Sequence, residues 1–176
     1  MLGYEGTSMV REFTADVKEI KSVLRTEGKS YEIPRYQRGY SWRNAQVSTF
    51  WTDLTQEDIG LFIGTILMNQ GDRLGDRVEI IDGQQRLLTI TILFSSIRDA
   101  LDNIGGAGAY RIGQSIQDRY IEHEEGFGEE KQVKILASKS VRNYFQNLVV
   151  SYPRNEEDIE PTTDEERRVR GNKEIL

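Results

Sequence analysis

The sequence contains no cysteine, which excludes disulfides, thiolate catalysis and thiolate metal sites. It contains a single histidine, His123, in the acidic stretch "IEHEEGFGEE", which is predicted to be a solvated loop. One histidine cannot build a histidine-rich zinc centre or a His-Asn-His nuclease site. Any chemistry of this chain must therefore come from carboxylates, amides, hydroxyls and arginines.

Long apolar runs are also missing. No stretch reaches the roughly 20 residues that span a bilayer, and the start "MLGYEGTSMVREF" has no secretory signal pattern. We therefore expect a soluble, cytoplasmic protein. The formal charge of -6 repels nucleic acid overall, but screening limits exposed charges to about 8 Å at physiological salt, so a local basic face could still contact phosphate.

Such a basic cluster exists in residues 31–43, "YEIPRYQRGYSWR", where three arginines face one acidic residue. Three interpretations stay open. Its aromatic rings could anchor a loop against the core, and for Trp42 packing is favoured. Alternatively, Arg38 could reach a phosphate while Tyr36 and Gln37 face a base or sugar. Arginines interleaved with aromatic rings also suit a nucleic-acid surface, through charge neutralisation and stacking.

The order of predicted elements is mixed. Helices are expected over residues 14–28 with Thr14 as cap, over 44–54 with Asn44 as cap, over 84–104, over 114–121 and over 140–151. The helix from Asn44 is expected to turn Val47, Phe50, Trp51 and Leu54 to one face. The helix over 84–104 is expected to be central and buried at first, with a polar face near Arg98.

Strands are expected over residues 30–33, 61–68, 77–82 and 132–137, with 61–68 and 77–82 forming a hairpin. Residues 34–43 and 105–113 are expected to be loops. We predict one domain over residues 1–153. Residues 154–176 are too charged to close a core, so they are predicted to be a tail, or the start of a helical linker that docks on a missing part.

In "IIDGQQRLL" a strand runs into a helix with almost no loop. The first turn of a helix has unsatisfied N–H groups and a partial positive charge, so this turn is predicted to hold an anion such as phosphate. Gly83 allows close approach of the backbone, and Arg86 adds a planar charged fork. The amides of Gln84 and Gln85 suit holding a water or reading a polar group.

Asp82 and Gln85 also have the spacing of a capping box, and spacing alone favours that structural interpretation. A cap does not explain the second glutamine, or an arginine placed just before a wholly apolar run. If a polyphosphate binds, Asp82 would repel it unless a cation lies between them. Asp82 is therefore expected to hold Mg²⁺ or to orient an attacking water.

The segments "IPRYQRGYSW", "QVSTFWTDL", "LFIGTILM" and "IIDGQQRLLTITIL", in this order, resemble the N-terminal domain of GmrSD-type modification-dependent restriction systems. The phosphorothioate-sensing defence protein SspE carries the same kind of domain. The similarity covers about residues 15–150, since "KILASKSVRNYFQNLV" resembles the later strand and helix of that domain. Leu88 departs from the threonine that is more usual after "DGQQRL".

The resemblance implies an α+β fold of the ParB/sulfiredoxin-like class, with a small mixed sheet and a central buried helix after the DGQQR turn. It implies binding of an NTP, with GTP favoured, together with Mg²⁺. Hydrolysis would be tied to sensing modified DNA and to licensing a nuclease. That nuclease, of the His-Asn-His type, is expected as a separate module in cis or in trans, and self-association is a further expectation.

The resemblance and the residues together give a set of predicted roles. Nucleotide binding is assigned to Arg38, Gly83, Gln84, Gln85 and Arg86, catalysis to Asp82, Gln84 and Gln85, and DNA binding to Arg35, Tyr36, Gln37 and Tyr40. Two alternatives stay open. The chain could be a non-catalytic module that binds modified DNA and keeps the turn as a helix cap. Less favoured is a ParB-like nuclease in its own right, because no cluster of carboxylates or histidines is evident.

Overall fold

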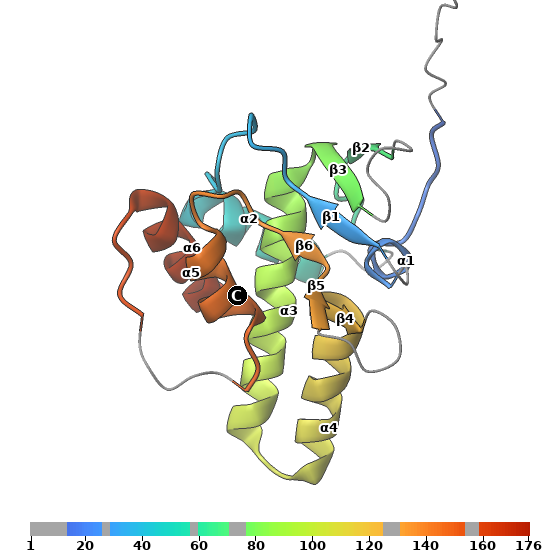
Figure 1. Cartoon of the computed structure of the whole chain (residues 1–176). Coiled ribbons are helices and arrows are strands. Elements are labelled where there is room, and N and C mark those ends of the chain that lie inside the picture. The colour runs from blue at the N-terminus through green and yellow to red at the C-terminus, as the bar shows by residue number, and fades with distance from the viewer. Residues whose placement is uncertain (1–13, 26–28, 57–59, 71–76, 125–130, 154–158) are drawn as a thin grey trace, which may run out of the picture.

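The structure is a computed structural model that describes residues 14–25, 29–56, 60–70, 77–124, 131–153 and 159–176. It is a mixed α+β domain in which helices surround a small sheet (Figure 1). The elements in chain order are α1 (Ile20–Leu24), β1 (Ser30–Glu32), α2 (Asn44–Gln56), β2 (Leu67–Asn69), β3 (Arg77–Asp82), α3 (Gln84–Ile104), α4 (Ala107–Ile116), the π-helix η1 (Gln117–Ile121), β4 (Glu122–Glu124), β5 (Lys131–Val133), β6 (Ile135–Leu136), α5 (Arg142–Phe145), the π-helix η2 (Gln146–Val150) and α6 (Asp164–Ile175).

The main sheet has four strands in the order β2-β3-β1-β6. Its middle strand β1 runs parallel to both neighbours, so that Tyr31 is in register with Val78 and with Ile135. β2 pairs antiparallel with β3, which confirms the predicted hairpin, although its first strand covers only residues 67–69. In β3, Val78 and Ile80 are buried while Arg77 is exposed, the alternation expected of a strand with one face on the core.

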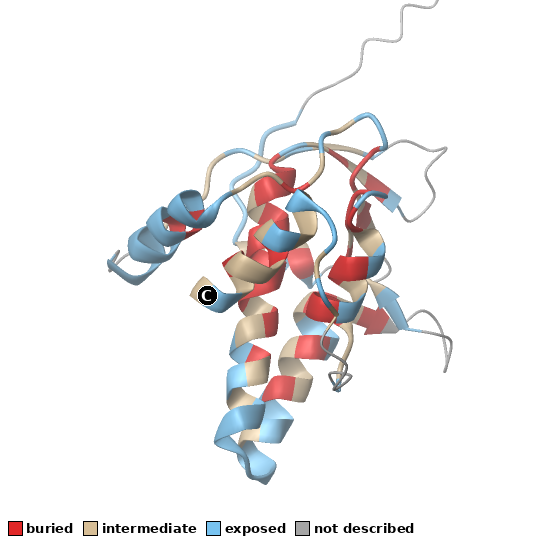
Figure 2. Ribbon diagram, turned by 90° about the vertical axis from the view of Figure 1, so that its left-hand side faces the viewer, coloured by how far each residue is buried: buried red, intermediate tan, exposed pale blue. Residues whose placement is uncertain are grey.

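The long helix α3 is the centre of the core, as predicted. After the polar first turn, every residue from 87 to 93 is buried, including Leu87, Leu88, Ile90 and Ile92. Figure 2 shows that burial is concentrated in this half of α3, whereas the far end and the adjoining part of α4 are exposed. None of the described helices is long and apolar enough to cross a membrane.

Arg98 departs from its predicted place on a polar face, because it is fully buried. Its guanidinium donates to the Gln117 side chain in η1 and to the carbonyls of Val149 and Val150 in η2, at 3.2 and 3.3 Å for the carbonyls. A buried charge needs such partners, and the last carbonyls of a helix have no partner within the helix, so those of Val149 and Val150 can accept from Arg98. Arg98 therefore joins α3 to both π-helices.

The charged C-terminal region forms a helix that packs on this domain, which corrects the prediction of a tail or of docking on a missing part. Thr163 caps α6 in a capping box with Glu166. Val169 and Asn172 are fully buried against the body of the domain. α6 lies beside α2, α3 and α5 (Figure 1). So few apolar residues suffice because α6 adds to an existing core and does not have to close one.

Other sequence predictions need correction at the edges of elements. The first helix begins at Ile20 with Glu19 in the cap position, so Thr14 is not its cap. Val17 is fully exposed, so earlier turns would lack the packing that short helices require. Residues 61–66 have no regular structure. The predicted stop at residue 28 lies outside the described residues.

In the second half of the chain, the glycine-rich stretch expected to be a loop is mostly the helix α4. It packs along α3, where Gly113 is buried and a Cβ there would lie 3.6 Å from the Arg98 carbonyl oxygen, so tertiary packing overrides the low helix propensity. The predicted strand over 132–137 divides into β5 and β6 in different sheets. His123 is buried in β4, paired in register with Gln132, and is not in a solvated loop.

The prediction for α2 holds in part. The helix begins at Asn44, but the Arg43 carbonyl accepts from the amide of Val47, so Arg43 occupies the cap position. Val47 and Phe50 are buried, as predicted for the inward face. Trp51 and Leu54, which were predicted to share that face, are exposed on the outside of the helix.

Candidate phosphate-binding turn

The DGQQR motif forms a tight turn from strand to helix. β3 ends at Asp82, Gly83 adopts φ 91° and ψ 4°, and α3 begins at Gln84. A Cβ at residue 83 would lie 3.0 Å from Cγ1 of Ile66 and 3.2 Å from its Cα. Glycine is required here on two counts, because other residues avoid this positive φ and because the neighbouring backbone is close.

The start of α3 keeps its amides available. Its first helical bond runs from the Leu87 amide to the Gly83 carbonyl at 3.1 Å. Over the described ranges, no group accepts from the amides of Gln84, Gln85 or Arg86. The helix end therefore carries free donors and a partial positive charge, the combination that binds anions.

The capping box suggested by spacing does not form. Gly83 is the N-cap residue and no side chain caps the helix. Asp82 lies one residue too early, at the end of β3, and its side chain is 70 % exposed. The Gln85 side chain points to a different segment: its Oε1 accepts from the Ser41 amide at 2.7 Å and its Nε2 donates to the Gly39 carbonyl at 3.0 Å.

The motif thus holds the "YQRGYS" loop against the end of β3. Gln84 Nε2 donates to the Arg38 carbonyl at 3.0 Å. From the loop, Gln37 Nε2 donates in the other direction, to the Ile81 carbonyl at 2.9 Å. Two segments more than forty residues apart in sequence are therefore joined side by side.

One polar atom in this turn has no hydrogen-bond partner in the described part of the chain. Gln84 is 6 % exposed, and its Oε1 is buried with no hydrogen-bond donor among the described residues. The orientation of the amide is fixed, because its Nε2 must face the Arg38 carbonyl. Burying an acceptor without a donor is unfavourable, so this oxygen marks a place where a ligand or a water would be bound.

Arg86 is held beside the turn. Its Nη1 donates to the Thr65 carbonyl, and its Nη2 lies 4.0 Å from Oδ2 of Asp82. Gly64, at φ 91°, passes so close that a Cβ there would lie 2.9 Å from Nη1. The Arg86 side chain, 28 % exposed, is therefore positioned by the backbone and is still accessible to an anion.

The predicted DNA-binding residues divide into two groups. Arg35, Tyr36 and Arg38 are exposed, Tyr36 at 73 %, and Gln37 is half-buried. Tyr40 is 1 % exposed, so the structure places it in the core and not on a DNA-binding surface.

The Tyr40 hydroxyl is part of a hydrogen-bond chain. It accepts from Nδ2 of Asn172 at 2.9 Å and lies 2.8 Å from the Thr89 hydroxyl. Because that hydroxyl already donates to the Gln85 carbonyl, Tyr40 donates to Thr89. Burial raises the pKa of the Tyr40 phenol, which keeps it protonated as this role requires.

The far side of the loop is held by α6, which sequence reasoning missed. The Glu165 carboxylate accepts from the Tyr40 amide at 2.5 Å and from the hydroxyls of Ser138 and Ser140 at 3.1 and 2.6 Å. A Cβ at Gly39 would collide with this carboxylate. The capping box at Thr163 could have revealed the helix, but nothing in the sequence indicated where it packs.

A cavity of about 360 Å³ adjoins Arg86. Trp42 lies at its wall, half-buried and tilted against Phe50 with ring centroids 6.1 Å apart, which confirms the predicted packing role of Trp42.

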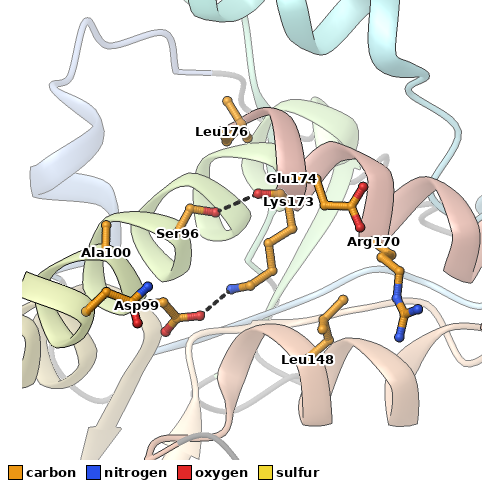
Figure 3. Close-up of a pocket in the computed structure, with 9 residues that line it drawn as sticks. Ser96, Asp99, Ala100, Leu148, Arg170, Lys173, Glu174 and Leu176 are labelled. Atoms are coloured by element: carbon orange, nitrogen blue, oxygen red, sulfur yellow. Dashed lines mark hydrogen bonds and ion pairs between the residues drawn. The ribbon is translucent and has the colours of Figure 1, made fainter. Parts of the chain in front are cut away.

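A larger cavity, about 440 Å³, lies away from the turn between α3, η2 and α6 (Figure 3). Two ion pairs hold its walls: Lys173 lies 2.9 Å from Asp99, and Arg170 lies 3.3 Å from Glu160. The Ser96 hydroxyl donates to the Lys173 carbonyl at 3.4 Å. These contacts attach α6 to α3, so we regard this cavity as a packing seam.

Metal binding by Asp82 stays a prediction. Within the part of the chain that the structure describes, no three His, Asp or Glu residues lie close enough together to hold a metal ion by themselves. The exposed Asp82 carboxylate next to free helix amides fits a cation that is shared with a bound phosphate.

The chain is thus a small α+β domain built from the sheet and the buried helix. The glycine turn between strand and helix has free amides that can bind an anion. A family model described as the GmrSD restriction endonuclease N-terminal domain matches residues 20–175, and the chain belongs to this family. A comparison with curated proteins found no match. The family match includes α6, in agreement with its packing on the domain.

Proposed function

We propose that this domain binds a nucleoside triphosphate at residues 82–86 and hydrolyses it, as the sensor part of a modification-dependent restriction system. The family makes the chain a component of a restriction system. The observation that carries the nucleotide proposal is the unused donor set at the start of α3, with Arg86 fixed beside it. A side-chain cap would have satisfied one or two of those donors, and none is present at α3.

The residues present fit a triphosphate with Mg²⁺. The amides of residues 84–86 and the Arg86 guanidinium would hold phosphate oxygens, and Asp82 would hold the cation. Bound Mg²⁺ would neutralise phosphate charge. Gln84 Oε1, the buried acceptor without a donor, would orient the attacking water. Gln85 acts by positioning, because both ends of its amide hold the loop.

The loop supplies a surface for the DNA that the sensor reads. Arg35, Tyr36 and Arg38 are exposed together, combining charge neutralisation with an aromatic ring that can stack on a base. The Arg38 carbonyl contacts the turn, and its exposed side chain is the alternative candidate for binding a phosphate. Cleavage would be performed by a separate His-Asn-His nuclease, in cis or in trans.

Thermal stabilisation by the four NTPs with Mg²⁺ tests the nucleotide proposal. We expect wild type and Arg77→Ala to gain thermal stability and to release phosphate, with release increased by modified DNA. Arg77 is an exposed arginine at the other end of β3, so it controls for loss of a charge. Arg86→Ala should lose both effects. If wild type shows neither stabilisation nor phosphate release with any NTP, with or without modified DNA, the proposal is wrong.

A non-catalytic DNA-recognition module is the second candidate. It is favoured by the three glutamine amides that tie the loop to the turn, because a purely structural motif would need the same bonds. This candidate predicts that Arg86→Ala lowers stability through its lost bond to Thr65 while DNA binding persists. It also predicts no phosphate release by the wild type.

A further inference from the structure

We propose that the Tyr40 amide and the hydroxyls of Ser138 and Ser140 form a second anion site, which binds a phosphodiester of the DNA backbone. In this structure the carboxylate of Glu165 occupies the site, and a DNA phosphate would displace it. This role rests on the proposed function, which assigns DNA contact to the YQRGYS loop, and extends it to two serines outside both motifs.

Three donors converge on the two carboxylate oxygens of Glu165. Oε1 accepts from the Tyr40 amide at 2.5 Å and from the Ser138 hydroxyl at 3.1 Å, and Oε2 accepts from the Ser140 hydroxyl at 2.6 Å. Gly39 leaves the space for the carboxylate, because a Cβ there would collide with it. The two oxygens stand in for the non-bridging oxygens of a phosphodiester, which accept from backbone amides and serine hydroxyls in the same way.

The fold holds these donors in place before a ligand binds. Gln85 fixes the backbone on both sides of Tyr40, through the Gly39 carbonyl at 3.0 Å and the Ser41 amide at 2.7 Å. The Tyr40 ring stays in the core, so only its amide belongs to the site. Ser138 is buried as well, whereas Ser140 is exposed and leaves the site open to solvent on that side. Donors that are already ordered bind an anion without the entropic cost of ordering them.

The charge of Glu165 has no cation partner within the described part of the chain. Arg38 directly precedes Gly39, and Lys139 lies between the two serines, yet neither side chain forms an ion pair with Glu165 or with another described residue. Both cations are exposed. A carboxylate that only had to hold the loop would be bound more strongly by pairing with one of them. Left unpaired, they can neutralise a phosphate that enters from solvent.

Glu165 can leave the site while α6 stays docked. It belongs to the first turn of α6 and is half-buried. The helix is attached further along by Val169 and Asn172, which are fully buried. A displaced carboxylate would remain beside the N-terminal end of α6, where the helix dipole favours negative charge. Exchange of Glu165 for a phosphate therefore requires rotation of one side chain.

Inorganic phosphate tests the site directly, with the apparent Kd taken from the rise in the thermal unfolding midpoint. All proteins carry Arg86→Ala, which removes the arginine of the phosphate turn. Adding Glu165→Ala should lower the apparent Kd at least about tenfold, the equivalent of one hydrogen bond to a charged group. Adding Glu174→Ala instead, which removes an exposed carboxylate elsewhere on α6, should not. Gly39→Ala combined with Glu165→Ala should abolish the gain, because its methyl group fills the site.

Binding of duplex DNA tests the displacement. Unmodified duplex is a sufficient probe, because a phosphate contact reads neither sequence nor modification. Glu165→Ala should bind it at least about tenfold more tightly than wild type. Glu174 lies nine positions along α6, about 13 Å away, so Glu174→Ala should stay close to wild type through screening. Replacing Ser138 and Ser140 by alanine in the Glu165→Ala protein should remove the gain.

Glu165→Gln keeps the size of the side chain and loses its charge, so its DNA affinity should lie between those of wild type and Glu165→Ala. It also provides the test if the alanine variant does not fold. Should Glu165 only hold the loop, both variants would bind DNA less tightly than wild type and phosphate would stabilise neither, which would overturn the proposal.

Three other results would also count against the site. Equal gains in Glu165→Ala and Glu174→Ala would reveal a general charge effect and refute it. A gain with inorganic phosphate but none with DNA would refute a phosphodiester as the ligand. Absence of DNA binding in every variant would refute the loop as a DNA surface. Failure of every NTP to bind would refute the nucleotide proposal alone, because none of these measurements uses a nucleotide.

Discussion

Gln84 and Gln85 are adjacent in the motif, but replacing them should change the free energy of unfolding by different amounts. Replacement of each by methionine keeps the length of the side chain and removes its polar atoms. Gln85 makes two hydrogen bonds to the loop, to the Ser41 amide and the Gly39 carbonyl. Gln84 makes one, to the Arg38 carbonyl, and buries an acceptor without a donor.

The expected magnitudes follow from these contacts. Gln85→Met loses two bonds worth about 1 kcal/mol each and leaves their partners unsatisfied, so we expect a loss of roughly 2–4 kcal/mol. Gln84→Met loses one bond of about 1 kcal/mol but removes a buried unsatisfied oxygen that costs about 1–3 kcal/mol. Its free energy of unfolding should therefore be unchanged or higher by up to about 2 kcal/mol.

Urea unfolding followed by circular dichroism measures both values, provided that the slope with denaturant stays the same. Equal losses in the two variants, or a larger loss in Gln84→Met, would refute the argument about the unpartnered oxygen. A second measurement connects stability to function. If Gln84 orients a water, Gln84→Met should remain folded and release less phosphate. Gln84 would then contribute to activity while lowering stability.

Three further predictions concern the rest of the fold. Arg98→Met should destabilise by roughly 3–5 kcal/mol in the same assay, because it takes from the Asp99 carboxylate its ion-pair partner 2.7 Å away and leaves the buried Gln117 side chain without its donor; a change below about 1 kcal/mol would show that these bonds contribute little. Gly39→Ala should displace the Glu165 carboxylate, so its cost should shrink in a Glu165→Ala background; equal costs in a double-mutant cycle would contradict this contact. Burial, with the hydrogen bond to Asp102, raises the pKa of Tyr152 to about 12, so its contribution to stability should be complete below about pH 10 and lost as the pH rises towards 12. Comparison of alkaline unfolding in wild type and Tyr152→Phe checks the last prediction, and identical profiles would exclude it.

Local sequence patterns predicted the central elements of the fold. The hairpin of β2 and β3 and the helix α3 follow from apolar periodicity interrupted by polar turn residues. α4 could not be predicted, because its glycines disfavour a helix until α3 is present to pack against it. α6 was missed for a related reason: its only fully buried residues are Val169 and Asn172, and their partners are distant in sequence.

The position of the candidate site in the chain could be predicted from the sequence, but its hydrogen bonds could not. Spacing placed Gly83 and Arg86 correctly at the start of a helix. The same spacing suggested a cap between Asp82 and Gln85, which the geometry of a positive-φ glycine prevents by placing Asp82 one residue too early. The bonds from the glutamines to the loop join residues about 45 positions apart, and no local rule anticipates such pairs.

The hydrogen-bond chain through Tyr40 has a mechanical consequence. It runs from Asn172 in α6, through the tyrosine hydroxyl and Thr89, to the carbonyl of Gln85 in the turn. The C-terminal helix and the strand-to-helix turn are thus connected through Tyr40 in the loop between β1 and α2. If the loop at Tyr40 moves, either α6 moves with it or these hydrogen bonds break. A conformational change at the turn therefore affects the last helix.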